Sequence, residues 1–113
     1  MITIYHNPRC RKSREALEIL KHKNLELDIV HYLQDTLKVG QLTQIISLLG
    51  IEPSALVRKN EKDWKDNFKG KELSQAKVID AIAEYPKIME RPIVINGKKA
   101  IIARPPERVL EII

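Results

Sequence analysis

The sequence of 113 residues contains a single cysteine, Cys10, so the chain cannot form an internal disulfide. One thiol and three histidines, without ligand-like spacing, do not suggest a metal site. The longest apolar runs are far too short to cross a membrane. One Phe and one Trp are too few for a surface that stacks nucleic-acid bases, in spite of a net charge of +5. We therefore expect no bound metal or cofactor, no membrane span and no nucleic-acid partner.

What remains is the composition of a small globular protein, with 43% apolar and 31% charged residues. The length fits one domain with its own core. The first residues run directly into a strand pattern, so we expect no signal peptide. An unpaired thiol is typical of the reducing cytosol. These features predict a cytoplasmic protein, which we expect to be a monomer.

The first fourteen residues carry the strongest chemical signal. Residues 2–5 form a strand pattern, residues 6–9 a loop, and Cys10 lies where an amphipathic helix begins. A helix N-terminus and cationic neighbours lower the pKa of a thiol from about 8.5. His6 precedes the cysteine by four residues, and the polar, basic flanks do not suit a buried apolar cysteine. The pattern predicts a reactive thiolate in a loop that attracts oxyanions. The basic neighbours of Cys10 are Arg9, Arg11, Lys12 and Arg14.

Hydrophobic periodicity and turn residues order the rest of the chain. The final helix begins around Pro105, and we expect it to pack on the core through Val109, Leu110 and Ile113. The Asn96-Gly97 pair predicts a two-residue hairpin turn. The other predicted helices are 11–22, a helix through 42–49 that ends at Gly50, 53–57, a short helix within 61–71, and one capped by Ser74; the other predicted strands are 25–30, 93–95 and 98–103.

This order gives a βαβ unit, a helical insertion over about residues 38–85, and a ββα unit. It predicts an α/β protein of thioredoxin-like layout, with a mixed sheet, in a single domain over residues 1–113. Thioredoxin-like folds place a cis proline opposite the cysteine, at the start of the third strand. Pro92 occupies that place, so we predict a cis Arg91–Pro92 bond.

Three arginines lie at predicted element boundaries, where a fold can aim side chains into a cleft: Arg58, Arg91 and Arg104. Each alone is most simply an exposed arginine. A multiply charged oxyanion is bound well by fixed cations that each donate two hydrogen bonds to it. Beside a nucleophile in an anion-binding loop, the three arginines together are of the type that binds such a substrate.

Along nearly its whole length the chain resembles the glutaredoxin-dependent arsenate reductases. The resemblance implies that Cys10 attacks arsenate, that His6 helps to keep the thiol ionised, and that glutathione and glutaredoxin supply electrons for reduction to arsenite. Its His-x3-Cys-x3-Arg motif matches His6, Cys10 and Arg14. The matching stretches are Ile2-Thr3-Ile4-Tyr5-His6-Asn7-Pro8, Cys10 with Ser13-Arg14, His31-Tyr32-Leu33, Arg58-Lys59-Asn60, Arg91-Pro92-Ile93-Val94 and Arg104-Pro105.

The resemblance also assigns the remaining site residues. It makes Arg58, Arg91 and Arg104 the arsenate-binding side chains, with Asn7, Ser13, Arg14 and Pro92 in supporting positions. One departure is Arg11, where the family commonly has Gly. Because the chain has no second cysteine, an external thiol such as glutathione is required as co-substrate.

The sequence fits three alternative functions to different degrees. The Spx-type regulators share this fold and bind RNA polymerase, but their redox switch is usually Cys-x-x-Cys, and Ser13 stands at the second position. A glutathione-linked thiol oxidoreductase of another substrate stays open. A low-molecular-weight phosphatase needs Cys-x5-Arg, and Ala16 stands where that arginine belongs.

Overall fold

The computed structural model describes residues 1–113. The chain divides into two compact units, which we call the sheet unit (residues 1–35 and 91–113) and the helical unit (residues 36–90). None of the helices is both long and apolar enough to span a membrane.

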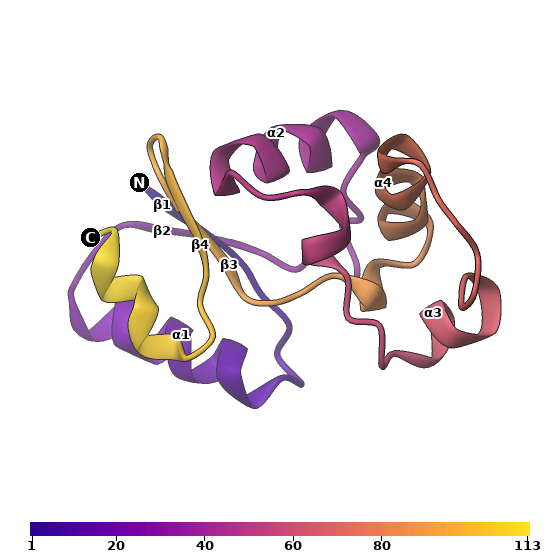
Figure 1. The fold of residues 1–113 in the computed structure, drawn as a ribbon. Helices are drawn as coiled ribbons and strands as arrows, with labels where there is room; N and C mark the ends of the chain where they lie inside the picture. The colour runs from indigo at the N-terminus through magenta and orange to yellow at the C-terminus, as the bar shows by residue number, and fades with distance from the viewer. The chain divides into compact units, whose positions relative to one another are not determined.

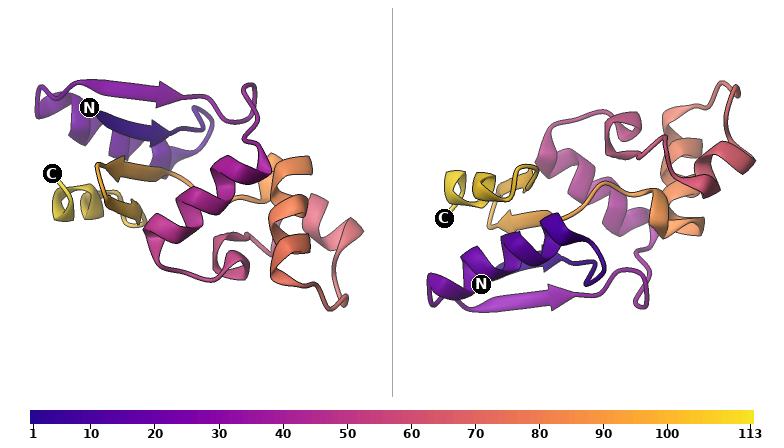
Figure 2. Two further views of the ribbon diagram at one scale, coloured as in Figure 1. Left: turned by 90° about the horizontal axis from the view of Figure 1, so that it is seen from above. Right: turned by 90° about the horizontal axis from the view of Figure 1, so that it is seen from below.

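The sheet unit is built on four short strands in the order β2-β1-β3-β4 (Figure 1). Strand β1 pairs parallel with β2 and antiparallel with β3, and β3 pairs antiparallel with β4. Figure 2 shows β1 and β2 running in one direction and β3 running against them. This confirms the mixed sheet and the thioredoxin-like fold. The strands are β1 (Ile2–Tyr5), β2 (Leu27–Val30), β3 (Ile93–Asn96) and β4 (Lys99–Ile102).

Alternation along β1 places Ile2 and Ile4 in the core of the sheet unit. Helix α1 (Arg11–His22) presents Leu17 and Leu20 to the same core, at the spacing of one helix face. The helix has its predicted bounds, and Asn24 follows it with a φ of 55°, the left-handed conformation that ends many helices. The next strand starts at residue 27 rather than at the predicted residue 25.

The hairpin differs from the prediction by one residue. Asn96 belongs to β3 and pairs with Lys99, so the two turn residues are Gly97 and Lys98. Gly97 has a φ of 62°, which a residue without Cβ adopts at low cost. The Asn96 side chain instead donates a hydrogen bond from Nδ2 to the carbonyl of Ile112 at 2.6 Å.

The packing predicted for the last helix is partly wrong. Residues Pro106–Glu111 form a 3₁₀ helix, η3, with three residues per turn. Val109 and Ile112, three residues apart, are therefore buried. Leu110 and Ile113, which an α-helical period would bury beside Val109, are 49% and 42% exposed.

The helical unit contains three α-helices and two short 3₁₀ helices. Helix α2 ends at Gly50, whose φ of 67° caps it, and the hydroxyl of Ser74 caps α4 by accepting from the N–H of Lys77. Both caps were expected from the sequence. The elements are α2 (Val39–Leu49), η1 (Pro53–Leu56), α3 (Lys62–Asn67), α4 (Gln75–Glu84) and η2 (Pro86–Ile88).

Candidate active site

Cys10 lies between the end of β1 and the first turn of α1, as the sequence predicted. It is the N-cap residue of α1, with extended backbone angles, and it is half-buried. Its N–H donates to the carbonyl of Asn7 at 3.0 Å, and its carbonyl accepts from the N–H of Arg14 at 3.0 Å. These bonds fix the thiol at the helix N-terminus, where unpaired N–H groups favour negative charge.

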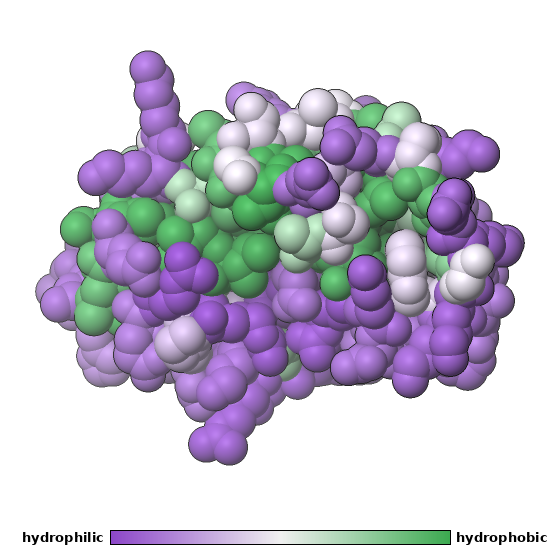
Figure 3. Space-filling view, viewed as in Figure 1, coloured by the Kyte–Doolittle hydropathy of each residue, from purple (hydrophilic) through white to green (hydrophobic).

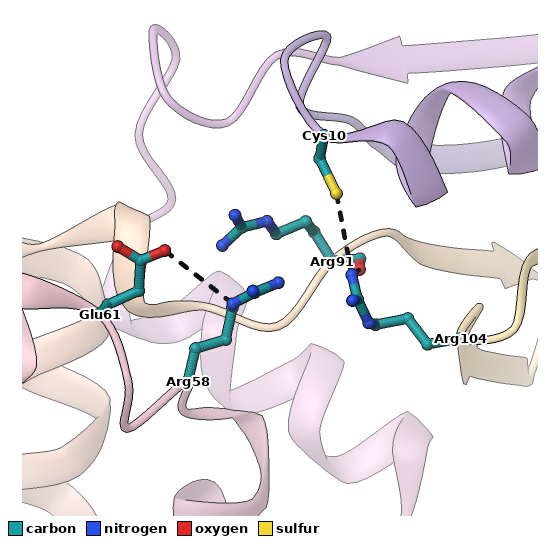
Figure 4. A network of polar contacts seen from close by, with 5 residues as sticks. All are labelled: Cys10, Arg58, Glu61, Arg91 and Arg104. Atoms are coloured by element: carbon teal, nitrogen blue, oxygen red, sulfur yellow. Dashed lines mark hydrogen bonds and ion pairs between the residues drawn. The ribbon is translucent and has the colours of Figure 1, made fainter.

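Two predicted arginines meet the thiol within the sheet unit (Figure 4). Nη1 of Arg104 lies 3.8 Å from Sγ of Cys10 and also donates to the carbonyl of Arg91 at 3.2 Å. Burial by itself raises the pKa of the Cys10 thiol, but the backbone N–H of Ser13 and the guanidinium groups of Arg91 and Arg104 outweigh it and lower that pKa. The site therefore favours the thiolate.

Both arginines precede a proline. The Arg91–Pro92 peptide bond is cis, and so is the Arg104–Pro105 bond, which was not predicted to be cis. The carbonyl of Pro92 accepts from the N–H of Ala103 at 2.9 Å, so the chain segments that carry the two arginines are tied to each other beside β3 and β4.

A buried polar network supports the loop before Cys10. Ser13 is fully buried, and its Oγ lies 2.6 Å from Nδ1 of His6 and accepts from the N–H of Asn7 at 3.1 Å. The carboxamide Oδ1 of Asn7 accepts from the N–H of Arg9 at 3.0 Å. His6 and Asn7 are buried as well. The network explains why polar residues occupy this buried loop.

His6 does not bond to the cysteine in this arrangement. Burial, followed by the charges of His31, Lys21 and Arg14, lowers the pKa of His6 from its ordinary 6.5, so its imidazole is neutral at pH 7. His6 contacts Ser13, whose N–H supports the thiolate. In this geometry His6 reaches the cysteine only through Ser13, and no imidazolium lies next to the thiol.

Arg58 belongs to the helical unit. Its N–H donates to the carbonyl of Ile88 at 2.7 Å, and its Nε lies 4.0 Å from Oε1 of Glu61 (Figure 4). The side chain is 27% exposed, and its buried Nη1 has no hydrogen-bond partner. A buried guanidinium nitrogen without a partner is costly, which suits a side chain that receives an anionic ligand. Glu61 was missed because a lone glutamate in a polar stretch carries no signal.

The basic residues of α1 serve different purposes. Nη1 of Arg14 donates to the carbonyl of Pro8 at 3.0 Å, so this side chain connects α1 to the loop before Cys10. Nε of Arg11 pairs with Oε1 of Glu15 at 2.9 Å on the surface. No group of three or more His, Cys, Asp or Glu side chains in the chain could hold a metal ion. The sheet unit thus offers a thiolate with cationic hydrogen-bond donors, which suits nucleophilic attack on an oxyanion.

Comparisons with known proteins agree with this chemistry. The family model that matches residues 5–112 is that of the ArsC family. An arsenate reductase of Haemophilus influenzae is 46% identical, with 99% of this chain and 98% of that protein covered. An Escherichia coli protein called YfgD is 43% identical, with 99% and 96% covered. The solved structure of an arsenate reductase from Vibrio cholerae covers 99% of this chain and 97% of its own, with a TM-score of 0.94 and 39% identity.

Proposed function

Because the chain belongs to the ArsC family, we propose that it reduces arsenate to arsenite, with Cys10 as the nucleophile and glutathione with glutaredoxin as the reductant. The observation that carries the proposal is the contact between Sγ of Cys10 and the guanidinium of Arg104. A thiolate that is held against a fixed cation can attack an anion that the same cation attracts.

The first step is displacement at arsenic. The Cys10 thiolate attacks arsenate, a proton converts one arsenate hydroxyl to water, the As–O bond to that water breaks, and a Cys10–S–As(V) adduct forms. We assign Arg91 and Arg104 to the oxyanion from the sheet unit and Arg58 from the helical unit. Their role is to neutralise the charge that the substrate brings to an already negative sulfur.

The second step moves two electrons. A glutathione thiolate attacks Sγ of Cys10, the S–As bonding pair stays on arsenic, and As(V) becomes As(III), which leaves as arsenite. Cys10 and glutathione are together oxidised to a mixed disulfide. A glutaredoxin thiolate then attacks the glutathione sulfur and releases the Cys10 thiolate. An external thiol is needed because Cys10 is the only cysteine. Since the cytosol is reducing, we propose that the protein is cytoplasmic. We also propose that it is a monomer.

The test is an NADPH-coupled assay with glutathione, glutathione reductase and glutaredoxin, in which arsenate is added or omitted. We expect NADPH oxidation that requires arsenate, the protein and both thiol components. Arsenite should appear in equal amount with the NADPH consumed. Oxidation that proceeds equally without arsenate would replace the proposal with a glutathione-linked thiol oxidoreductase of another substrate.

A further inference from the structure

A basic pocket of about 550 Å³ lies in the helical unit, at α3 and the turn that follows it. It is lined by residues 59–60, 64–65 and 68–71, and all the charged residues that line it are lysines. Figure 3 shows hydrophilic side chains over the region where α3 lies in Figure 1. The volume is that of a small-molecule site, so we asked which ligand chemistry its walls fit.

The only tryptophan and the only phenylalanine of the chain both line this pocket. The ring centroids of Trp64 and Phe68 lie 5.2 Å apart, and Phe68 contacts Tyr85 edge to face with a centroid distance of 5.6 Å. Tyr85 directly follows α4, so the rings are held in place from the body of the unit. Helix α3 has no buried residue, and Trp64 and Phe68 are only half-buried. Fixed aromatic surface is therefore available to a ligand.

The turn after α3 carries two lysines beside these rings. The N–H of Lys69 donates to the carbonyl of Trp64 at 3.2 Å, and the N–H of Lys71 donates to the carbonyl of Phe68 at 3.0 Å. Gly70 lies between the two lysines with a φ of 79°, which a residue without Cβ adopts at low cost. The backbone next to the pocket is therefore held by hydrogen bonds.

The lysines of the pocket have no counter-charge within it. No carboxylate lines the pocket, and the carboxylate of Asp66 on the same helix bonds to Lys62, which does not line it. Lysines gathered around one cavity create a positive potential that attracts an anion. Three exposed lysines of this segment, none of which forms an ion pair with a carboxylate of the chain, are Lys65, Lys69 and Lys71.

We propose that this pocket binds a nucleoside polyphosphate. The phosphate groups bind Lys65, Lys69 and Lys71, and the base stacks on Trp64. An inorganic polyphosphate would leave the aromatic wall unused, and a nucleoside without phosphate would leave the lysines unused. The site goes beyond the reduction of arsenate, because Cys10 and the three arginines assigned to the oxyanion do not line it.

Trp64 itself provides the measurement, because as the only tryptophan it makes the tryptophan fluorescence of the protein a report on this pocket. The probes are ATP, tripolyphosphate and adenosine, without divalent cations. ATP should quench the fluorescence and bind about fivefold to a hundredfold more tightly than tripolyphosphate, which is measured by competition, since stacking adds to charge. Adenosine should bind more weakly than ATP. Absence of quenching by ATP, or equal affinity for ATP and tripolyphosphate, would overturn the proposal.

Lys65→Gln and Lys69→Gln test the phosphate contacts, with Lys77→Gln as the matched control. Lys77 is an exposed lysine of α4 that does not line the pocket, so its removal changes the net charge equally. Each pocket variant should lower the affinity for ATP about twofold to fivefold, the scale of a lost exposed ion pair, and the control should lower it less. An equal fall in the control would assign the binding to general electrostatics and overturn the proposal.

Trp64→Leu tests the stacking contact, and binding is then measured by calorimetry because the fluorophore is gone. ATP should bind this variant only as tightly as tripolyphosphate does, while the affinity for tripolyphosphate stays that of the parent. Trp64→Phe retains a smaller ring and should bind ATP with intermediate affinity, which decides the question if the leucine variant does not fold. Parental affinity for ATP in both variants would overturn the proposal.

Two further measurements separate this site from other interpretations. A poly-glutamate peptide that binds more tightly than ATP would assign the pocket to an acidic protein partner and overturn the proposal. Cys10→Ser should bind ATP as the parent does, because Cys10 does not line the pocket. If ATP binds as expected but arsenate is not reduced, the proposed function fails and the nucleotide site is unaffected.

Discussion

Arg104 and Arg58 belong to different compact units, and the structure gives them different neighbours. Arg104 of the sheet unit contacts Sγ of Cys10 and the carbonyl of Arg91. Arg58 of the helical unit bonds through its backbone to Ile88 and lies near the carboxylate of Glu61. Arg104 therefore contacts the nucleophile, whereas these contacts of Arg58 lie within its own unit.

The residues that lower the pKa of the thiol do not include Arg58, which we propose to bind the substrate. The groups that lower the pKa of Cys10 are Ser13, Arg91 and Arg104, all in the sheet unit. Arg58 is absent from them. We therefore expect the thiolate to be set by the sheet unit alone, and a role of Arg58 to show only when an oxyanion is present.

The largest effect is expected for Cys10→Ser, which removes the proposed nucleophile. A serine hydroxyl without an adjacent general base does not attack arsenate. Arsenite production in the coupled assay should fall to the rate without protein. Arsenate turnover that persists in this variant would take Cys10 out of the mechanism.

Arg104→Ala and Arg58→Ala test the two arginines separately. Each should reduce kcat/KM for arsenate by about tenfold to a thousandfold, the effect of one lost charge-stabilising contact. Of these two variants only Arg104→Ala should also raise the pKa of Cys10, because Arg104 contacts the thiol and Arg58 is not among the groups that lower its pKa. The pKa is measured from the pH dependence of alkylation by iodoacetamide, a neutral reagent.

Lys59→Ala is the matched control for Arg58, since it removes a neighbouring exposed cation of the same unit. It should leave both kcat/KM and the alkylation profile close to the parent. A pKa shift of Cys10 in Arg58→Ala as large as that in Arg104→Ala would contradict the expectation that the sheet unit alone sets this pKa.

Ser13→Ala tests whether the sheet unit depends on its buried network. The change leaves Nδ1 of His6 and the N–H of Asn7 without their partner in a buried loop. We expect the free energy of unfolding to fall by about 1–3 kcal/mol, measured by urea denaturation. Ser47→Ala, at an exposed position of α2, should change it by less than about 0.5 kcal/mol.

The smallest effect is a pH dependence of stability from His6. Its pKa is lowered in the folded state, first by burial, so below pH 6.5 the unfolded chain binds a proton that the folded chain does not. Stability from this group is thus fully present above about pH 6.5 and decreases as the pH falls toward the folded pKa.

His6→Gln should flatten the dependence of the free energy of unfolding on pH between 7.5 and 5. The control is His22→Gln, at an exposed histidine of α1, which should keep the slope of the parent. An unchanged slope in His6→Gln would show that His6 binds its proton equally in both states.

The sequence was most informative where one local rule decides the structure. The hydrophobic period of α1, the N-cap Ser74 and the αL stop at Gly50 each depend on neighbours a few residues away, and each was predicted. The position of Cys10 at a helix N-terminus followed from the same kind of pattern. Local chemistry therefore predicted both the elements and the nucleophile.

The sequence was least informative where contacts between residues far apart in the chain determine the structure. The period of η3 depends on packing against α1, so Leu110 was wrongly expected to be buried. The turn register depends on the pairing of Asn96 with Lys99. The contact of Arg104 with Cys10, residues 94 positions apart, needed the fold. The resemblance named these arginines without showing which one touches the sulfur.

The hydroxyl of Ser13 limits how this scaffold can evolve. A cysteine at this position would create the two-thiol sequence Cys-x-x-Cys in one codon change. The sulfur of that cysteine is larger and a weak acceptor, so the N–H of Asn7 would lose its bond and His6 would lose a close partner. A second thiol at this position would therefore destabilise the buried loop unless residues 6 and 7 changed with it.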